Sequence, residues 1–171
     1  MCSIKLRPLS EKDAPLMLEW LKDKDVTRYF RFDSSSSTIE SVVDFINESQ
    51  NIDESVHFAI VNADSDEYLG TISLKNIDSV AKNAEYAIVL HKNAHGKGYA
   101  QAATDSILDF GFNELGLERI YFNVVSANER AIRFYEKYGF INEGEFKSHI
   151  NIRGEVYSLK WFRMMRDEYG K

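Results

Sequence analysis

The amino-acid sequence predicts an α+β fold in which helices flank a mostly antiparallel mixed sheet. Short runs rich in β-branched and aromatic residues recur along the chain. Two of them, residues 56–62 and 68–75, are separated by the turn-forming Asp64-Ser65-Asp66. Segments with apolar residues at helical spacing lie between such runs, and no internal repeat is visible. The 171 residues, 44% of them hydrophobic, fit one domain spanning residues 1–171.

The first half of the chain begins with a strand and two helices. Residues 3–8 alternate apolar and polar side chains, which is typical of a short strand. Ser10 then offers a cap for a helix, and Thr38 starts a second helix after the polar tract 33–37. The hairpin follows, and a third β-rich run over residues 84–91 extends the sheet.

The second half contains two more helices and two more strands. Helical spacing predicts helices over residues 100–115 and 128–138, each followed by a glycine that can end it. Strands are predicted over residues 118–125 and 156–165.

Composition narrows the function classes. The net charge of −6 argues against a dedicated nucleic-acid binder, because such proteins usually need a basic surface to displace counterions. No run of eighteen apolar residues exists and the amino terminus lacks the apolar block of a signal peptide, so we expect a cytoplasmic protein without a membrane segment. Cys2 is the single cysteine, no metal-ligand spacing surrounds it, and we expect it to have no role.

The segment His95-Gly96-Lys97-Gly98-Tyr99-Ala100 lies between a predicted strand and a predicted helix. Two glycines at this junction let backbone N–H groups approach an anion without a Cβ in the way. The first turn of the helix adds unpaired N–H groups and a partial positive charge of about half an electron. An ordinary turn is the alternative, since glycine pairs occur in many turns.

Asn128 and Tyr135 lie on the same face of the helix predicted after this segment. Seven residues at about 100° each place the two side chains within roughly 20° of each other and roughly 10 Å apart along the axis. One extended ligand can therefore touch both. The alternative is that Tyr135 belongs to an apolar stripe and that Asn128 only caps the helix.

Together, these two segments resemble the GNAT superfamily of N-acetyltransferases, closely over residues 84–140 and more loosely elsewhere. The family's first motif, Gln/Arg-x-x-Gly-x-Gly/Ala, is similar to residues 95–100, with His95 where Gln or Arg is usual. Its second motif, Asn-x-x-Ala-x-x-Phe-Tyr-Glu-Lys-x-Gly-Phe, is similar to residues 128–140. The resemblance implies a GNAT fold and an acetyl-CoA-dependent N-acetyltransferase.

The resemblance also implies roles for individual residues. It assigns the pyrophosphate of acetyl-CoA to residues 96–101 and the pantetheine arm to Asn128 and to the backbone of Val89 and Leu90. The residues expected to contact the coenzyme are Val89, Leu90, His95, Gly96, Lys97, Gly98, Tyr99, Ala100, Gln101, Asn128 and Arg133. Arg130 and Lys137 are further candidates for the 3′-phosphate, although a solvated charged face fits these cations equally well.

Two residues are expected to move protons. The resemblance assigns Tyr135 as the proton donor to the leaving thiolate, and a phenol with a pKa of about 10 holds its proton at neutral pH. Attack on a thioester needs a neutral amine, so a base must act directly or through water. Glu85 is the candidate base and lies on the strand before residues 95–100, the segment that we call the glycine loop. An ion pair with Lys75 or Lys82 is its alternative role. His57, His91 and His149 are spare candidates.

The acceptor is less sharply specified. The resemblance extends to the branch that contains ribosomal-protein amino-terminal, spermidine and nucleotide-amino-sugar acetyltransferases, whose members often self-associate. Residues 20–45 hold carboxylates beside aromatic side chains, which favours a small cationic amine. The carboxylates are Asp23, Asp25, Asp33, Glu40 and Asp44. Arg28 and Arg31 favour a phosphate or a peptide carboxylate instead. The competing classes are a noncatalytic acyl-CoA sensor and a Rossmann-type nucleotide-binding fold, and the strand order argues against the latter.

Overall fold

The computed structural model describes residues 3–51 and 53–170, so the expectation for Cys2 lies outside the described residues. Within these ranges seven strands form one sheet in the order β1-β2-β3-β4-β5-β7-β6. The strands are β1 (Ile4–Pro8), β2 (Val56–Asn62), β3 (Tyr68–Asp78), β4 (Asn83–Leu90), β5 (Arg119–Val125), β6 (Ile141–Ile152) and β7 (Glu155–Met165). Strands β4 and β5 are parallel and the other neighbours are antiparallel, which confirms the predicted fold class.

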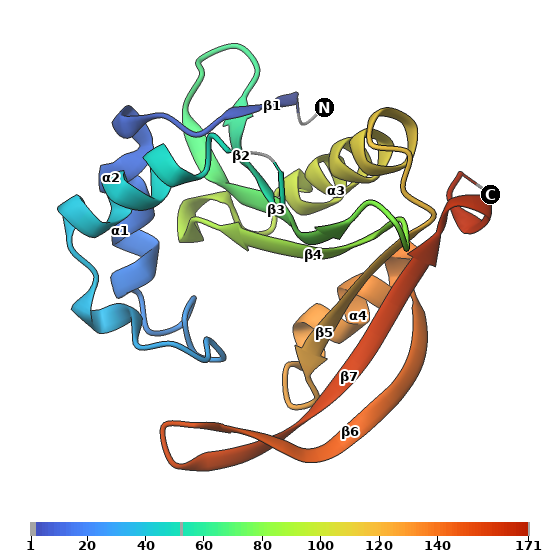
Figure 1. Cartoon of the computed structure of the whole chain (residues 1–171). Helices are drawn as coiled ribbons and strands as arrows, with labels where there is room; N and C mark the ends of the chain where they lie inside the picture. The colour runs from blue at the N-terminus through green and yellow to red at the C-terminus, as the bar shows by residue number, and fades with distance from the viewer. Residues whose placement is uncertain (1–2, 52, 171) are drawn as a thin grey trace.

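Helices cover the two faces of the sheet (Figure 1). The α-helices are α1 (Ala14–Lys22), α2 (Ile39–Glu48), α3 (Tyr99–Asp109) and α4 (Glu129–Tyr138). Helices α1 and α2 pack on one face through a cluster that includes Met17, Ile46 and Val61. Helices α3 and α4 pack on the other face through a larger cluster that includes Ile107 and Phe162. None of the described helices is long and apolar enough to cross a membrane.

Local signals explain where several helices begin. The Thr38 hydroxyl accepts a hydrogen bond from the Ser41 amide at 3.1 Å and caps α2, as its sequence position predicts. Ser10 precedes a 3₁₀ turn, Glu11–Asp13, that leads into α1. The buried carboxylate of Asp13 accepts two hydrogen bonds of 2.8 Å from the Arg7 guanidinium, which ties the start of α1 to β1.

Strand β6 is an element that the sequence prediction lacks. Nearly all of its side chains are exposed, so it has no apolar alternation to detect. Its register with β7 also shifts twice, between Asn142 and Gly144 and between Phe146 and Ile150. Such bulges interrupt the period of two that sequence reasoning depends on.

The helix after the glycine loop also differs from the prediction. It is α-helical to Asp109 and then widens into a π-helical turn, Phe110–Glu114, where the Leu115 amide donates to the Phe110 carbonyl at 3.0 Å. Gly111 lies in this turn, and a Cβ there would come within 2.8 Å of Ile120. Close packing against β5 therefore accompanies the wider turn.

Candidate active site

Strands β4 and β5 part in the middle of the sheet. They pair over three positions, Asn83 with Arg119, Ala84 with Ile120 and Glu85 with Tyr121. Beyond Glu85, β4 continues to Leu90 and β5 continues to Val125 without pairing with each other. Backbone groups in a sheet are normally satisfied by the neighbouring strand, so the gap leaves donors and acceptors for a ligand.

The alternation of β4 shows which backbone groups face this gap. The His91 amide donates to the Leu69 carbonyl on β3 at 2.8 Å. Backbone groups alternate sides along a strand, so those of Val89 also face β3 and those of Ile88 and Leu90 face β5. A Cβ at Gly70 on β3 would lie 2.4 Å from the Val89 carbonyl oxygen, which agrees with that direction. The backbone of Ile88, rather than the expected backbone of Val89, therefore faces the gap together with that of Leu90, although Val89 is among the residues that line the cavity.

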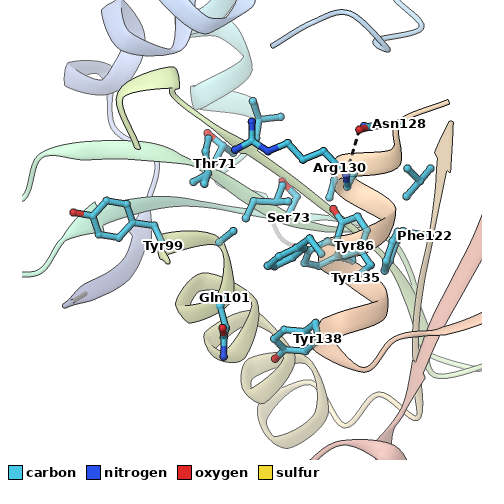
Figure 2. Close-up of a pocket in the computed structure, with 18 of the residues that line it drawn as sticks. Thr71, Ser73, Tyr86, Tyr99, Gln101, Phe122, Asn128, Arg130, Tyr135 and Tyr138 are labelled. Atoms are coloured by element: carbon cyan, nitrogen blue, oxygen red, sulfur yellow. Dashed lines mark hydrogen bonds between the residues drawn. The ribbon is translucent and has the colours of Figure 1, made fainter. Parts of the chain in front are cut away.

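A cavity of about 1560 Å³ occupies the gap. Pockets for one drug-sized molecule usually measure roughly 300–1,000 Å³, so there is room for an elongated ligand and a second molecule. Its walls come from the strands, the glycine loop, α4 and the loop between α1 and α2. Figure 2 shows one part of it, with Tyr86, Phe122 and Tyr135 close together below Asn128 and Arg130.

The glycine loop lies beside the gap, where the sequence places it. Gly96 and Gly98 have φ angles of +73° and +79°, a region that side chains disfavour, and Gly98 is the N-cap of α3. No side chain caps this helix, so its first-turn N–H groups are left for a ligand. The predicted contact residues that line the cavity here are His95, Gly96, Gly98, Tyr99, Ala100 and Gln101. Lys97 is not among the lining residues.

His95 has a structural task within this loop. Its Nε2 atom lies 3.0 Å from the Leu90 carbonyl oxygen, so the imidazole donates to that carbonyl. One of the two backbone groups of Leu90 is thus engaged within the protein. The Leu90 amide and the backbone of Ile88 remain directed toward the gap.

Helix α4 places Asn128 and Tyr135 along one side of the cavity. The Asn128 side chain caps the helix by accepting from the Ala131 amide at 3.3 Å, and it also lines the cavity. Tyr135 lines the cavity with only 9% of its surface exposed, and its ring centroid lies 4.3 Å from that of Phe122. Burial raises the pKa of Tyr135 to about 12, and a hydrogen-bond interaction with Tyr86 opposes the shift.

A chain of hydroxyl groups continues from Tyr135 into the core. The Tyr86 hydroxyl lies 2.9 Å from Thr104 Oγ1, and Thr104 donates to the Ala100 carbonyl at 2.7 Å. Tyr86 must therefore be the donor to Thr104. The contact of Tyr86 with α3 is a feature that sequence spacing alone could not reveal.

Glu85 lies on the opposite face of β4 from Tyr86 and lines the cavity. Its carboxylate accepts a hydrogen bond of 3.0 Å from Asn76 and lies 3.9 Å from the Lys75 ammonium group. The ion pair with Lys75 is thus present, and with 24% of the side chain exposed the carboxylate also remains open to the cavity.

His57 is the spare histidine that joins Glu85 on this face. Its Nδ1 atom lies 2.6 Å from Ser73 Oγ on β3, and both residues line the cavity. Burial, together with the charge of Lys75, lowers the pKa of His57 and favours the neutral imidazole. By contrast, His91 is buried against Glu19 at 2.7 Å, and His149 lies on exposed β6.

The basic residues of α4 divide between two faces. Arg133, expected at the coenzyme, does not line the cavity and instead lies 3.6 Å from Glu129 on the exposed side of the helix. Arg130 and Lys137 line the cavity, and neither has an ion-pair partner among the described residues. These two cations, rather than Arg133, are therefore available to an anion.

The loop between α1 and α2 supplies a further part of the cavity wall. It contributes Asp25, Tyr29, Phe30, Arg31 and Phe32 to the lining. The other four carboxylates of the predicted acidic set lie outside the lining, where Asp23 and Asp33 cap local turns and Glu40 and Asp44 are exposed on α2. Among the described residues, no group of three or more His, Cys, Asp or Glu side chains is placed to hold a metal ion.

Comparisons with known proteins agree with this geometry. Residues 3–141 match the family model described as an acetyltransferase (GNAT) domain. Spermidine N(1)-acetyltransferase of Escherichia coli K12 is 32% identical over 90% of this chain and 81% of its own length. An uncharacterized N-acetyltransferase, p20 of Bacillus licheniformis, is 27% identical over 97% of this chain and 94% of its own length.

A solved structure shares the whole architecture. Spermidine N-acetyltransferase from Vibrio cholerae, in complex with CoA and spermine, superposes with a TM-score of 0.89 at 22% identity and covers 99% of both chains. With the family model covering most of the chain, the protein belongs to the GNAT acetyltransferase family.

Proposed function

We propose that this protein transfers the acetyl group of acetyl-CoA to a primary amine by direct attack in a ternary complex. The observation that carries the proposal is the parting of β4 and β5 beside the uncapped N-terminus of α3, with Tyr135 and Glu85 on opposite sides of the gap. Family membership supports the reaction class. The Vibrio cholerae structure contains CoA, which supports the cosubstrate.

The residues present fit acetyl-CoA as a substrate. The pyrophosphate matches the first-turn amides of α3 and the positive-φ Gly98, because a helix N-terminus without a cap is an anion site. Arg130 and Lys137 offer charge for a further phosphate. The backbone of Ile88 and the Leu90 amide offer a strand edge to the amide groups of the pantetheine arm.

The chain's own residues supply the proton transfers in this proposal. Glu85 takes a proton from the ammonium form of the acceptor, directly or through water, so that nitrogen can form the new C–N bond. The C–S bond breaks, and the Tyr135 hydroxyl gives its proton to the leaving thiolate. The second proton of the attacking nitrogen then returns to Tyr135 through water, which leaves a neutral amide and a free thiol, and the proton on Glu85 passes to solvent. Because burial keeps Tyr135 protonated, the donor is ready at neutral pH.

A small cationic amine is the acceptor that we favour. Asp25 lines the cavity together with Tyr29, Phe30 and Phe32, and we call this part of the lining the acceptor end. A carboxylate and aromatic rings in one wall suit a cation by charge attraction and cation–π contact. The spermidine acetyltransferase of Escherichia coli, at 32% identity, supports the same class. Arg31 also lines this end and favours an acceptor that carries an anion, such as a nucleotide amino sugar or a protein amino terminus with a nearby carboxylate.

A panel of acceptors tests the proposal. Release of free thiol from acetyl-CoA is measured with spermidine, a peptide with a free amino terminus, and a nucleotide amino sugar. We expect the polyamine to be turned over fastest, with a KM that rises with salt because exposed charge attraction is screened. Turnover of another acceptor alone would reassign the substrate. Coenzyme binding with no turnover of any amine would favour a noncatalytic acyl-CoA sensor.

A further inference from the structure

The turn between β6 and β7 carries an arginine at an unfavourable backbone position. Ile152 pairs with Glu155, which leaves Arg153 and Gly154 as a two-residue loop with φ angles of +48° and +89°. Hairpin turns with two positive φ angles favour Asn-Gly, and an arginine at the first position is uncommon. A residue held in such a conformation points to a use for its side chain.

The Arg153 guanidinium contacts a loop that is more than 120 residues away in the sequence. It donates to the carbonyl oxygens of Arg28 at 2.5 Å and of Thr27 and Phe30 at 3.4 Å each. All three carbonyls belong to the segment between α1 and α2. The planar fork of arginine presents several donors in a fixed arrangement, so one side chain can hold several carbonyls together.

Further contacts attach the same loop to the C-terminal half of the sheet. The Tyr29 hydroxyl lies 3.5 Å from the Ala127 carbonyl oxygen, and the Tyr29 ring packs edge-on against Tyr157 at 5.8 Å. Arg31 donates to the side chain of Asn123 on β5. The loop therefore starts at α1, on the β1–β4 side of the gap, and is held on the β5–β7 side.

Between these anchors, the loop forms a wall of the cavity. Tyr29, Phe30, Arg31 and Phe32 all line the acceptor end. The ring centroid of Phe30 lies 6.0 Å from that of Trp20 and 5.4 Å from that of Phe32, so Phe30 is the middle residue of an aromatic row. Its backbone carbonyl is one of those that Arg153 holds. Moving that backbone would move the surface against which an acceptor packs.

We propose that Arg153 is a positioning residue for the acceptor, because its guanidinium holds the α1–α2 loop across the gap and so forms the acceptor wall. The role in acceptor binding rests on the proposed acetyl transfer. The role in ordering the loop does not, so the two can be tested separately.

The Arg153→Asn variant tests the guanidinium separately from the conformation of the turn. Asparagine suits the first position of this turn better than arginine, so the hairpin should keep its stability while the fork is lost. Hydrogen exchange of peptides from residues 24–32 should accelerate about tenfold or more, the scale of losing hydrogen bonds from a charged donor. Lys147→Asn is the matched control. It removes a cation from the same hairpin, and that cation pairs with Glu145 and not with the loop. It should leave exchange in this loop unchanged.

Kinetics then test the acceptor role. With the best amine from the panel, Arg153→Asn should raise the acceptor KM about tenfold while the calorimetric Kd of CoA stays within twofold of wild type. Arg153→Lys should recover part of the lost affinity, because it keeps the charge without the fork. A destabilised fold would instead weaken CoA binding as well, and the melting temperature checks this directly.

Two results with Arg153→Asn, and one with the wild-type protein, would count against the inference. Wild-type exchange in the loop of Arg153→Asn would show that the guanidinium does not hold it. Faster exchange with an unchanged acceptor KM would show that the loop is held without forming the acceptor wall. A wild-type protein that binds CoA and acetylates no amine would contradict the proposed function and the acceptor role, while the exchange result still decides whether Arg153 orders the loop.

Discussion

Tyr135 is buried and also lines the cavity. Its folded-state pKa of about 12 lies above the ordinary value of about 10, so the fold favours the protonated phenol. The stability linked to this shift is fully present below about pH 10 and is lost as the pH rises through the folded pKa. Loss of the Tyr135 proton should therefore not limit turnover in neutral or mildly alkaline buffer.

The Tyr135→Phe variant tests the proton donor. We expect kcat to fall by roughly 10² while the Kd of CoA changes by only a few fold, because phenylalanine keeps the ring packing and removes the acid. Steady-state kinetics and calorimetry on the same preparation measure both quantities. Unchanged turnover with the best acceptor would mean that another group, such as water, supplies the proton.

Glu85→Gln tests the base on the other side of the gap. Glutamine can still accept from Asn76, so the local packing should be kept while the proton acceptor is lost. We expect kcat/KM to fall by an amount that shrinks as the pH rises, since the free amine then forms without help. A loss of equal size at every pH would point to acceptor binding or strand packing instead. His57→Gln is the comparison variant on the same face, and it should show no such trend.

At the residue scale, the sequence predicts short-range arrangements better than contacts between strands. Asn128 and Tyr135 are on one helix, so a fixed rotation per residue places both at the cavity. The same geometry could have separated Arg130 from Arg133, because Glu129 stands four residues before Arg133 and marks the exposed face. The pairing of His57 with Ser73 depends on the register of β2 and β3, which shifts at a bulge between Ile60 and Val61 that the sequence pattern does not mark.

At the scale of elements, the glycine loop joins a strand, a turn and a helix start. Gly98→Ala tests it, because a Cβ at a φ of +79° costs about 1–2 kcal/mol and would also stand where backbone should meet phosphate. We expect a modest loss of stability and a loss of CoA affinity of about tenfold or more. Thermal unfolding and calorimetry measure the two effects.

Gly116→Ala is the matched control for backbone strain. Gly116 has a φ of +69°, and a Cβ there meets no atom within 4 Å. It should lose a similar amount of stability and bind CoA like wild type. Equal loss of affinity in both variants would mean that backbone strain, and not a lost contact between phosphate and backbone, explains the result at Gly98.

Most elements follow from local patterns, and the exceptions have physical causes. Strand β2 begins and ends at the predicted residues because its apolar run is bounded by turn-forming residues. Strand β6 was missed because its side chains face solvent and its bulges break the alternation. The π-helical turn at Phe110 accompanies close packing of Gly111 against β5, a tertiary contact that helical spacing does not encode.

At the scale of the whole molecule, the parting of β4 and β5 couples ligand binding to stability, because a ligand that binds only the folded protein stabilises it. CoA at about 100 times its Kd should stabilise the protein by roughly 2.7 kcal/mol. In a chain of this size that corresponds to a rise in melting temperature of roughly 5–10 °C. Hydrogen exchange should slow at the amides of Ile88 and Leu90, whereas a general stabilisation would slow exchange at β2 as strongly. Equal protection of both strands would contradict pairing at the gap.

The short seam between β4 and β5 has a mechanical consequence. Three residue pairs are all that join β4 laterally to β5 within the described sheet, and the loop between α1 and α2 adds contacts across the gap through Arg31 and Arg153. Beyond Glu85 on β4 and Tyr121 on β5, no strand pairing between these two strands resists their relative movement. A pantetheine chain lying between β4 and β5 would add hydrogen bonds at the unpaired edge of β4 and stiffen this part of the sheet while it is bound. Departure of the thiol product would then remove those hydrogen bonds and leave the two strands freer to move apart, which suits the entry of the next long, flexible substrate.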